Sequence, residues 1–402
     1  MKPSPQRRTY RESARPRVFL IMMVLAVLTA TRMDAEVTTN ELRWSQLPPL
    51  PGALGVAGAF AGVSDGKLIV AGGANFPDKM PWEGGQKVWH DTVYVLDQTN
   101  TGWRVAGKLP RPLAYGISLT TEHGVLCIGG SDATRHYANT FLLTWANGKI
   151  VTHELPPLPV PLANAAGALV GQVAYVAGGS EAPGEQAALN RCFALELAAL
   201  AEPILPSSEG EGESRAAAGG SNSESKITRS ASGKSHLAWT ELSPCPGEAR
   251  ILPTAGATTD AFYLMGGAAL RLQGDKVKRV YLRDAWKYSP SSGNWERLAD
   301  LPRPSVAAPS PAPIVDATLL LIGGDDGSLV NFQPMARHPG FPHLAQALDL
   351  RTGNWSQLDH IPVARATLPA VRWRGLFVLP SGEVRPGVRS PEVWAVRGNG
   401  RD

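Results

Sequence analysis

The residues best suited to acid–base chemistry lie together near the end of the chain, in the run Ser381–Ser390. Glu383 stands six residues before Arg389, with a Pro386-Gly387 turn between them. A carboxylate can take up and release a proton, and a guanidinium beside it can hold an anion. The run therefore predicts an acid–base site for an anionic molecule, although an ordinary ion pair on a solvated loop is the alternative interpretation.

A second candidate segment is the loop from Asn75 to Trp89, which interleaves aromatic and basic side chains. Aromatic faces such as those of Trp82 and Trp89 suit the C–H surfaces of sugars, and Lys87 could meet an anion. The alternative is that the two tryptophans only pack the loop onto its own repeat.

Metal chemistry is not expected, because the eight histidines and three cysteines show no metal-ligand spacing. Cys127, Cys192 and Cys245 are too few for a disulfide scaffold. We expect them to be buried as small apolar side chains, with one disulfide as the alternative.

The elements that would position the candidate residues are six repeats of one pattern. In each repeat an apolar strand ends in a glycine pair, which suits a strand that turns close to another backbone. In the last repeat Ser381 replaces the first glycine of the pair. The second glycines are Gly73, Gly130, Gly179, Gly267, Gly324 and Gly382. Successive spacings lie between 49 and 58 residues, except for one of 88 that contains the Ser/Gly/Glu-rich stretch 202–235, which we interpret as a disordered insertion.

Four strands are predicted in each repeat. A strand of small residues precedes the apolar strand, a third strand follows a variable loop, and a Trp-x-x-Leu strand comes last. The third strands are expected at Thr92–Leu96, Thr140–Leu143, Cys192–Leu195, Asp284–Tyr288, Leu344–Leu348 and Glu392–Ala395. The last strands are expected to begin at Trp44, Trp239, Trp295 and Trp355, with Trp103 and Thr152 holding that place in the weaker copies.

This arrangement predicts an all-β fold, a six-bladed β-propeller over residues 36–402. A four-stranded sheet cannot bury both faces alone, whereas radial stacking buries them against neighbours and protects the edges. The chain begins with the strand at Trp44–Leu47 and stops after the third strand of the sixth repeat, so the N-terminal strand is expected to complete the last blade. The pattern resembles kelch repeats over residues 41–397, and kelch propellers include both enzymes and binding proteins.

The composition agrees with a folded β-rich chain. Hydrophobic residues make up 43% of the 402 residues, which excludes wholesale disorder, and 42 glycines with 34 prolines suit many short strands joined by turns. The formal net charge of +4 comes from residues 1–35, which hold seven Lys or Arg and two acids. The remainder is close to neutral, so nucleic acid is not an expected partner.

The basic N-terminus has its own interpretation. Five arginines up to Arg17 precede an apolar run from Val18 to Leu28, and small residues follow at Ala30 and Ala35. This pattern is typical of a secretory signal peptide over residues 1–35, with an uncleaved anchor as the alternative. We expect a periplasmic or secreted protein with no stable membrane span after cleavage.

A more specific resemblance rests on several short motifs. They are the run Gly-Glu-x-x-Pro-Gly-x-Arg at 382–389, the stretches 58–64 and 71–76 in the first repeat, and 111–119 in the second. With six kelch repeats and a secretion signal, these motifs are similar to the N-acetylneuraminate epimerase (sialic acid mutarotase) family, with the blades in cyclically permuted order.

The resemblance implies an isomerase that interconverts the α and β anomers of N-acetylneuraminate or a related acidic sugar, a small-molecule partner. It implies that Glu383 transfers protons, that Arg389 holds the substrate carboxylate, and that no metal or organic cofactor takes part. Asn164 and Arg250, early in their repeats, are weaker candidates for which solvated surface is the alternative. The full set of candidates for binding the sugar is Asn75, Trp82, Lys87, Trp89, Arg111, Tyr115, Asn164, Arg250 and Arg385.

The chain departs from the family pattern in two places. The loop from Asp325 to Pro342 is short where well-known members carry a long insertion, and the stretch 202–235 is not a family feature. These departures affect the expected substrate more than the expected reaction. A non-catalytic kelch propeller that binds protein or glycan through its loop face is the alternative function.

Overall fold

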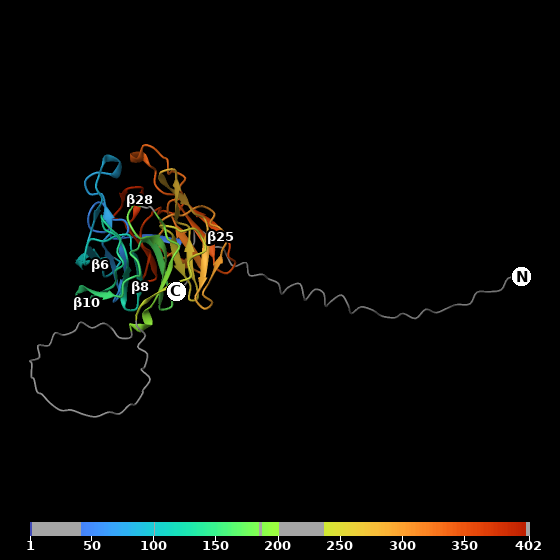
Figure 1. The fold of residues 1–402 in the computed structure, drawn as a ribbon, viewed down its shortest axis with the longest axis horizontal. Helices are drawn as coiled ribbons and strands as arrows, with labels where there is room; N and C mark the ends of the chain where they lie inside the picture. Colours follow the sequence, from blue (N-terminus) through green and yellow to red (C-terminus); the bar gives the residue numbers. More distant parts are fainter. Residues whose placement is uncertain (2–41, 100, 185–186, 201–236, 399–402) are drawn as a thin grey trace, which may run out of the picture. The chain divides into compact units, whose positions relative to one another are not determined.

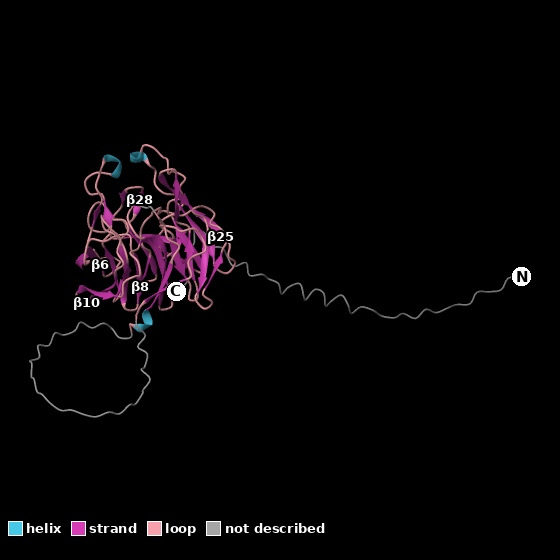
Figure 2. Cartoon of the chain, viewed as in Figure 1, coloured by secondary structure: helices cyan, strands magenta, loops and turns pink. Residues whose placement is uncertain are grey.

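Six four-stranded antiparallel sheets form the fold of this protein in a computed structural model (Figure 1 and Figure 2). The structure describes residue 1 and residues 42–99, 101–184, 187–200 and 237–398. The chain divides into two units, residues 1–36 and 37–402, and the sheets belong to the second. The predicted signal peptide, apart from residue 1, and the whole of the predicted insertion at 202–235 lie outside the described residues.

Each sheet is one blade, numbered I to VI along the chain. The strands of each blade in pairing order, innermost first, are: in blade I, β2 (Phe60–Ser64), β3 (Lys67–Ala71), β6 (Thr92–Leu96) and β7 (Arg104–Lys108); in blade II, β8 (Ile117–Thr121), β9 (Gly124–Ile128), β10 (Thr140–Ala146) and β11 (Lys149–Leu155); in blade III, β12 (Ala163–Val170), β13 (Val173–Ser180), β14 (Cys192–Glu196) and β15 (Trp239–Leu242); in blade IV, β16 (Thr254–Ala257), β17 (Phe262–Met265), β20 (Ala285–Ser289) and β21 (Asn294–Arg297); in blade V, β22 (Ile314–Val315), β23 (Thr318–Ile322), β24 (Leu344–Asp349) and β25 (Trp355–Asp359); and in blade VI, β26 (Val371–Trp373), β27 (Leu376–Pro380), β30 (Val393–Gly398) and β1 (Leu42–Leu47).

The predicted six-bladed fold is confirmed, including its closure. Strand β1 pairs antiparallel with β30, so that Leu42 lies opposite Gly398 and Leu47 opposite Val393. The N-terminal strand therefore completes the last blade. The third strands begin within one residue of their predicted positions in every blade.

Apolar packing holds neighbouring blades together. Six clusters of buried side chains lie one at each blade-to-blade interface. The repeated tryptophans add a hydrogen bond to this packing, because the indole N–H reaches a carbonyl just beyond the outer strand of the preceding blade. These bonds join Trp103 to Pro48, Trp239 to Pro156, Trp295 to Ser243 and Trp355 to Ala299, at 2.7 to 3.1 Å.

Backbone hydrogen bonds join the blades near the axis. The second glycine of each repeat donates its N–H to a carbonyl of the next blade, and six such bonds close a ring. They run from Gly73 to Leu113, Gly130 to Leu162, Gly179 to Arg250, Gly267 to Ser305, Gly324 to Arg365 and Gly382 to Val56. Close approach explains the glycines: a Cβ on Gly72 would lie 2.3 Å from the Leu113 oxygen, and the φ of Gly72 is +67°.

Ser381 fits the glycine position of blade VI because its hydroxyl forms hydrogen bonds with the backbone groups that lie close to it. Its Oγ accepts the Val56 N–H at 2.7 Å and lies within donating distance of the carbonyls of Val56 and Ser390. Its φ of +61° matches the left-handed backbone of the glycines that it replaces. The departure from the glycine pair therefore adds a link between blades VI and I.

Several short elements lie outside the blade sheets. The hairpin β4 (Ala74–Asn75) with β5 (Val88–Trp89), which encloses the 3₁₀ turn η2 (Pro81–Glu83), follows the glycines of blade I. The hairpin β18 (Ala268–Gln273) with β19 (Lys276–Tyr281) follows those of blade IV, and β28 (Glu383–Arg385) with β29 (Val388–Arg389) follows those of blade VI. The turn η4 (Met335–Arg337) lies in the loop of blade V, and in Figure 2 both η2 and η4 lie at the same end as β28, with η3 (Leu197–Ala199) at the other.

All three cysteines are free and buried, as expected for small apolar side chains. Within the described residues, no helix combines the length and apolarity needed to cross a membrane.

Candidate functional site

Glu383 and Arg389 face each other across the hairpin β28–β29. The two residues are cross-strand partners in its register, and Pro386-Gly387 forms the turn between the strands. Arg389 Nη2 lies 2.7 Å from Glu383 Oε1, with side-chain exposures of 3% for Arg389 and 18% for Glu383. The interpretation of these residues as a solvated loop pair does not fit this burial.

The backbone fixes the place of Glu383 in the blade. Glu383 follows Gly382, whose N–H bonds to Val56 of blade I. It also forms a β-bridge with Ala366, with both backbone hydrogen bonds present at 2.9 and 3.0 Å. The carboxylate therefore stands on a segment tied to two blades.

The electrostatic surroundings of Glu383 suit proton transfer near neutral pH. Burial raises the pKa of Glu383, because the charged form loses solvation. The positive charges of Arg389, Lys87 and Arg279 act in the opposite direction, while Asp325 adds to the rise. A carboxylate with a raised pKa is a better match for acid–base work at neutral pH than an ordinary one.

Glu383 lines a cavity of about 310 Å³ at the mouth of the propeller, which we call the mouth cavity. Four predicted sugar-binding residues line it as well: Lys87, Trp89, Tyr115 and Asn164. The remaining wall includes Asp132, His136, Ser180, Arg279 and Thr367. Loops of five blades therefore meet in one cavity.

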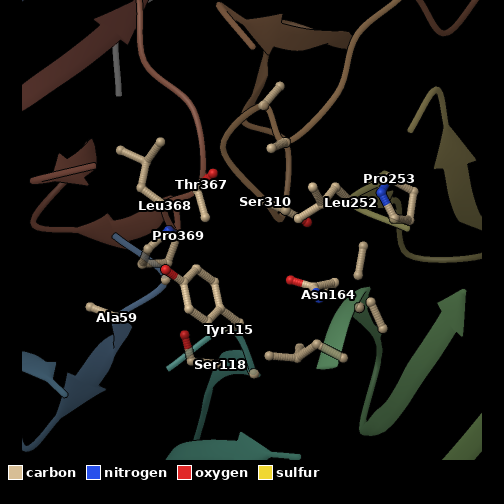
Figure 3. Close-up of a pocket in the computed structure, with 18 residues that line it drawn as sticks. Ala59, Tyr115, Ser118, Asn164, Leu252, Pro253, Ser310, Thr367, Leu368 and Pro369 are labelled. Carbon is tan, nitrogen blue, oxygen red and sulfur yellow. The ribbon is translucent and has the colours of Figure 1, made fainter. Parts of the chain in front are cut away.

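The floor of the mouth cavity is a second ring of backbone hydrogen bonds around the axis. Six residues, one from each blade, each donate an N–H to the carbonyl of the preceding member at 2.7 to 2.9 Å. They are Gly58, Tyr115, Asn164, Leu252, Ala307 and Thr367, all with φ between +53° and +65°. Figure 3 shows Tyr115, Asn164, Leu252 and Thr367 around the axial channel below, a space of about 70 Å³. The closed ring holds five non-glycine residues in a left-handed conformation that a free chain would disfavour.

Lys87 occupies an aromatic cage on the wall of the mouth cavity. Its Nζ lies 5.0 Å from the ring centroid of Tyr115, 5.5 Å from that of Trp89 and 5.8 Å from that of Phe76. Trp89 and Tyr115 themselves meet edge to face. Each of these two side chains has a buried polar atom, Trp89 Nε1 and Tyr115 OH, with no hydrogen-bond partner in the described part of the chain.

Three predicted sugar-binding residues instead hold the loops in place. The Asn75 amide is buried, where it donates to the Gly55 carbonyl at 2.8 Å and contacts His90 Nε2 at 2.9 Å. Trp82 lies beneath Arg385, whose guanidinium is 5.9 Å from the Trp82 ring and donates to the Ala336 carbonyl. This contact ties the loop of blade I to β28, so Trp82 has a packing role, but against blade VI and not against its own repeat.

Arg111 also lies apart from the mouth cavity. Its guanidinium stacks 4.6 Å over the ring of Tyr137, in a small side pocket. The Tyr137 hydroxyl bonds to Asp132, which lines the mouth cavity. Arg111 therefore reaches the site only through two other side chains.

The prediction that Arg250 binds sugar is wrong, because its side chain belongs to the core. The guanidinium is 1% exposed and forms a two-pronged ion pair with Asp284 at 2.6 and 2.9 Å. Its remaining N–H groups bond to the carbonyls of Gly266 and Glu248 at 3.0 Å. Four of its five N–H groups are thus engaged within the core and the residue does not line the mouth cavity, so solvated surface was equally wrong for this residue.

Sequence reasoning missed Arg279, Asp132 and His136 at the mouth cavity. Arg279 lies in a basic run between the second and third strands of blade IV, and the other two lie in the corresponding loop of blade II. The signal that could have found them is position, since these loops follow the glycine pairs as the Glu383 loop does. Within the described residues, no group of three or more His, Cys, Asp and Glu side chains is placed to hold a metal ion.

Comparisons with known proteins agree with the resemblance seen in the sequence. The family model described as N-acetylneuraminate epimerase matches residues 26–152. An N-acetylneuraminate epimerase of Yersinia enterocolitica is 40% identical over 141 residues, covering 30% of this chain and 35% of that protein. One of Brucella melitensis is 42% identical over 123 residues, covering 27% of this chain and 31% of that protein. The match thus spans about a third of the length of these curated relatives.

A solved structure shares the fold. The structure titled "Structure of YjhT" aligns with a TM-score of 0.58 at 13% sequence identity, covering 86% of this chain and 95% of that chain. The resemblance to the epimerase family is thereby confirmed over blades I and II, and the fold over most of the chain. The cyclically permuted order of the blades stays a prediction.

Proposed function

We propose that this protein is an isomerase that interconverts the α and β anomers of N-acetylneuraminate or a related acidic sugar. The matched segment 26–152 contributes Lys87, Trp89 and Tyr115 to the mouth cavity. Glu383 lies outside that segment, so its role rests on geometry and chemistry.

The observation that carries the proposal is the half-buried Glu383 carboxylate, paired with Arg389 at the wall of a concave polar cavity. Exchange of anomers needs a group that removes the proton of the anomeric hydroxyl. The ring oxygen must also be protonated as the bond between it and the anomeric carbon breaks. The open keto form then rotates, and the ring closes on the other face of the carbonyl.

Glu383 can serve both proton transfers in sequence. The carboxylate accepts the proton of the anomeric hydroxyl, and the resulting carboxyl group returns a proton to the ring oxygen through water or a neighbouring side chain. Closure reverses both transfers, so that Glu383 ends in its starting state. Positioned acid–base help of this kind is worth about 10²–10⁴-fold, or roughly 3–5 kcal/mol of activation free energy.

A non-catalytic binding module would place the two residues apart beside an apolar or aromatic patch. The 2.7 Å contact of Glu383 with Arg389, beside a mostly polar cavity that Glu383 lines, favours the enzyme.

The test is NMR of freshly dissolved N-acetylneuraminate, in which the approach to the equilibrium anomer ratio is followed with and without protein. We expect the wild type to accelerate it and Glu383→Gln to lose about 10²-fold or more. Glu296→Gln, an exposed carboxylate on β21 with a side chain 66% accessible, is the matched control and should retain full activity. Relaxation at the uncatalysed rate with wild-type protein would eliminate the proposal.

We also propose that residues 1–35 direct the chain to the periplasm or to secretion, because basic residues precede an apolar run too short to span a bilayer. N-terminal sequencing of the exported protein tests this, with a mature start after Ala30 or Ala35 expected. A chain retained in the cytoplasm with its first residues intact would contradict it.

A further inference from the structure

Lys87 is a cation at the mouth cavity that pairs with no anionic side chain among the described residues. Its ammonium group stands over three aromatic rings, and it forms no ion pair or hydrogen bond with any described residue. Ring faces stabilise a cation but leave its N–H donors unused. The ammonium can therefore meet an incoming carboxylate without first giving up a protein partner.

Arg389 is in the opposite situation. One nitrogen is engaged by Glu383 at 2.7 Å, its guanidinium lies 4.8 Å over the Phe76 ring, and its side chain is 3% exposed. Its Nε and Nη1 atoms are buried with no hydrogen-bond partner in the described part of the chain, and Arg389 does not line the mouth cavity. A substrate in that cavity meets Glu383 and Lys87, whereas Arg389 lies behind the carboxylate of Glu383.

The chemistry of the substrate class limits where its carboxylate can be held. In a cyclic 2-keto acid sugar the carboxylate and the anomeric hydroxyl are attached to the same carbon atom. A residue that holds the carboxylate must therefore stand beside the base that acts on the hydroxyl. Lys87 meets this condition, since it lines the same cavity as Glu383 and its charge acts on that carboxyl.

We propose, resting on the proposed function, that Lys87 binds the substrate carboxylate and so restricts the site to sugars with a carboxylate on the anomeric carbon. Arg389 is then a positioning residue that holds Glu383 in place. Arg279, an exposed residue of β19 that lines the same cavity, contributes to the positive potential there. Other 2-keto acid sugars fit the site by this reasoning, and aldoses do not.

The test uses a probe that binds without reacting, the methyl glycoside of N-acetylneuraminate. Its anomeric oxygen carries a methyl group in place of a proton, so its ring cannot open by proton transfer. Its methyl ester lacks the carboxylate charge and is the matched ligand control. Affinities for both are measured by calorimetry on wild type, Lys87→Met and Lys79→Met. Lys79 is an exposed lysine of the same loop that does not line the cavity.

We expect Lys87→Met to weaken binding of the acid about 10- to 100-fold, the loss typical of a hydrogen bond to a charged group. The wild type should bind the ester more weakly than the acid by a similar factor, and Lys79→Met should bind the acid with the affinity of the wild type. In the NMR assay Lys87→Met should raise KM more than it lowers kcat, and Lys87→Arg should restore much of the affinity.

Equal affinity of wild type and Lys87→Met for the acid would overturn the inference, as would equal affinity of the wild type for acid and ester. A larger loss in Arg279→Met than in Lys87→Met would also overturn it and assign the carboxylate to β19. Because the probe cannot mutarotate, these outcomes do not depend on catalysis. Failure of the proposed function shows separately, as unaccelerated relaxation of the free sugar with wild-type protein.

Discussion

Replacing Arg250 by methionine should destabilise the protein without changing how the mouth cavity binds ligand. Arg250 lies between blades III and IV, where its guanidinium donates four hydrogen bonds to Asp284, Gly266 and Glu248. Methionine fills a similar volume but leaves the Asp284 carboxylate, 16% exposed, with Trp286 Nε1 as its remaining side-chain donor. The variant thus removes one partner of a buried ion pair and leaves the other.

The expected loss is about 3–5 kcal/mol in the free energy of unfolding at neutral pH, the usual result of breaking a buried pair on one side. For a chain of this length that is a fall of roughly 4–7 °C in Tm. Burial would raise the pKa of Asp284, but the hydrogen bonds and charge of Arg250 outweigh it and hold the pKa below its ordinary value. A lowered pKa stabilises the fold above the unfolded value of about 4, and that contribution is lost as the pH falls through the folded pKa. The difference between wild type and variant should therefore be largest at pH 7 and shrink in acid.

Urea unfolding followed by circular dichroism at pH 7 and at about pH 2.5, below the ordinary carboxyl pKa of about 4, measures both quantities, with Asp284→Asn and the double variant completing the cycle. The reasoning would be refuted by a loss below about 1 kcal/mol at pH 7, or by weakened binding of the methyl glycoside in a variant of unchanged stability. The second result would show that Arg250 takes part in ligand binding.

Two further predictions concern Glu383 and the nearby Ser381. Catalysed mutarotation should fall as the pH drops through the pKa of Glu383, because only the ionised carboxylate accepts the anomeric proton. Burial raises that pKa, so the loss of activity should begin above about pH 4.3, where an exposed glutamate titrates. Arg389→Met should move this loss to still higher pH, because it removes the largest charge that opposes the rise in the pKa of Glu383. A pH–rate profile whose acid limb is the same in wild type and variant would contradict this. Ser381→Ala should lower the free energy of unfolding in urea by about 1–3 kcal/mol, because the Val56 N–H loses its buried acceptor between blades VI and I. The control Ser45→Ala, on the exposed side of β1, should be neutral. Equal stability of the two variants would show that the Ser381 link is dispensable.

The blades could be predicted from sequence because their signals are local and repeated. The glycine pairs mark places where one backbone passes another, and the tryptophans mark the outer strands. The Glu383–Arg389 pair could be predicted for the same reason: six residues and a Pro-Gly turn are enough to place both side chains on one hairpin. In each case the information lies within a few residues.

The roles of single polar residues could not be predicted, because they depend on partners far along the chain. Buried Arg250 pairs with Asp284, 34 residues later, and the Asn75 amide is engaged by the Gly55 carbonyl and by His90. Arg279 reaches the mouth cavity from β19 in blade IV, far along the chain from Glu383. A side chain's chemistry was readable from its type, but its accessibility was set by tertiary packing.

The position of Glu383 exists six times in the fold, once after the second glycine of each blade. The six residues are Ala74, Ser131, Ser180, Ala268, Asp325 and Glu383, and each pairs with the residue that precedes a member of the axial ring. Four are small. Asp325, in the neighbouring blade, is engaged by the Tyr281 hydroxyl at 2.9 Å and by the Gly327 N–H. The symmetric scaffold therefore offers one acid–base position per blade, and the small residues leave room for a ligand while the carboxylate of blade VI remains to act on it.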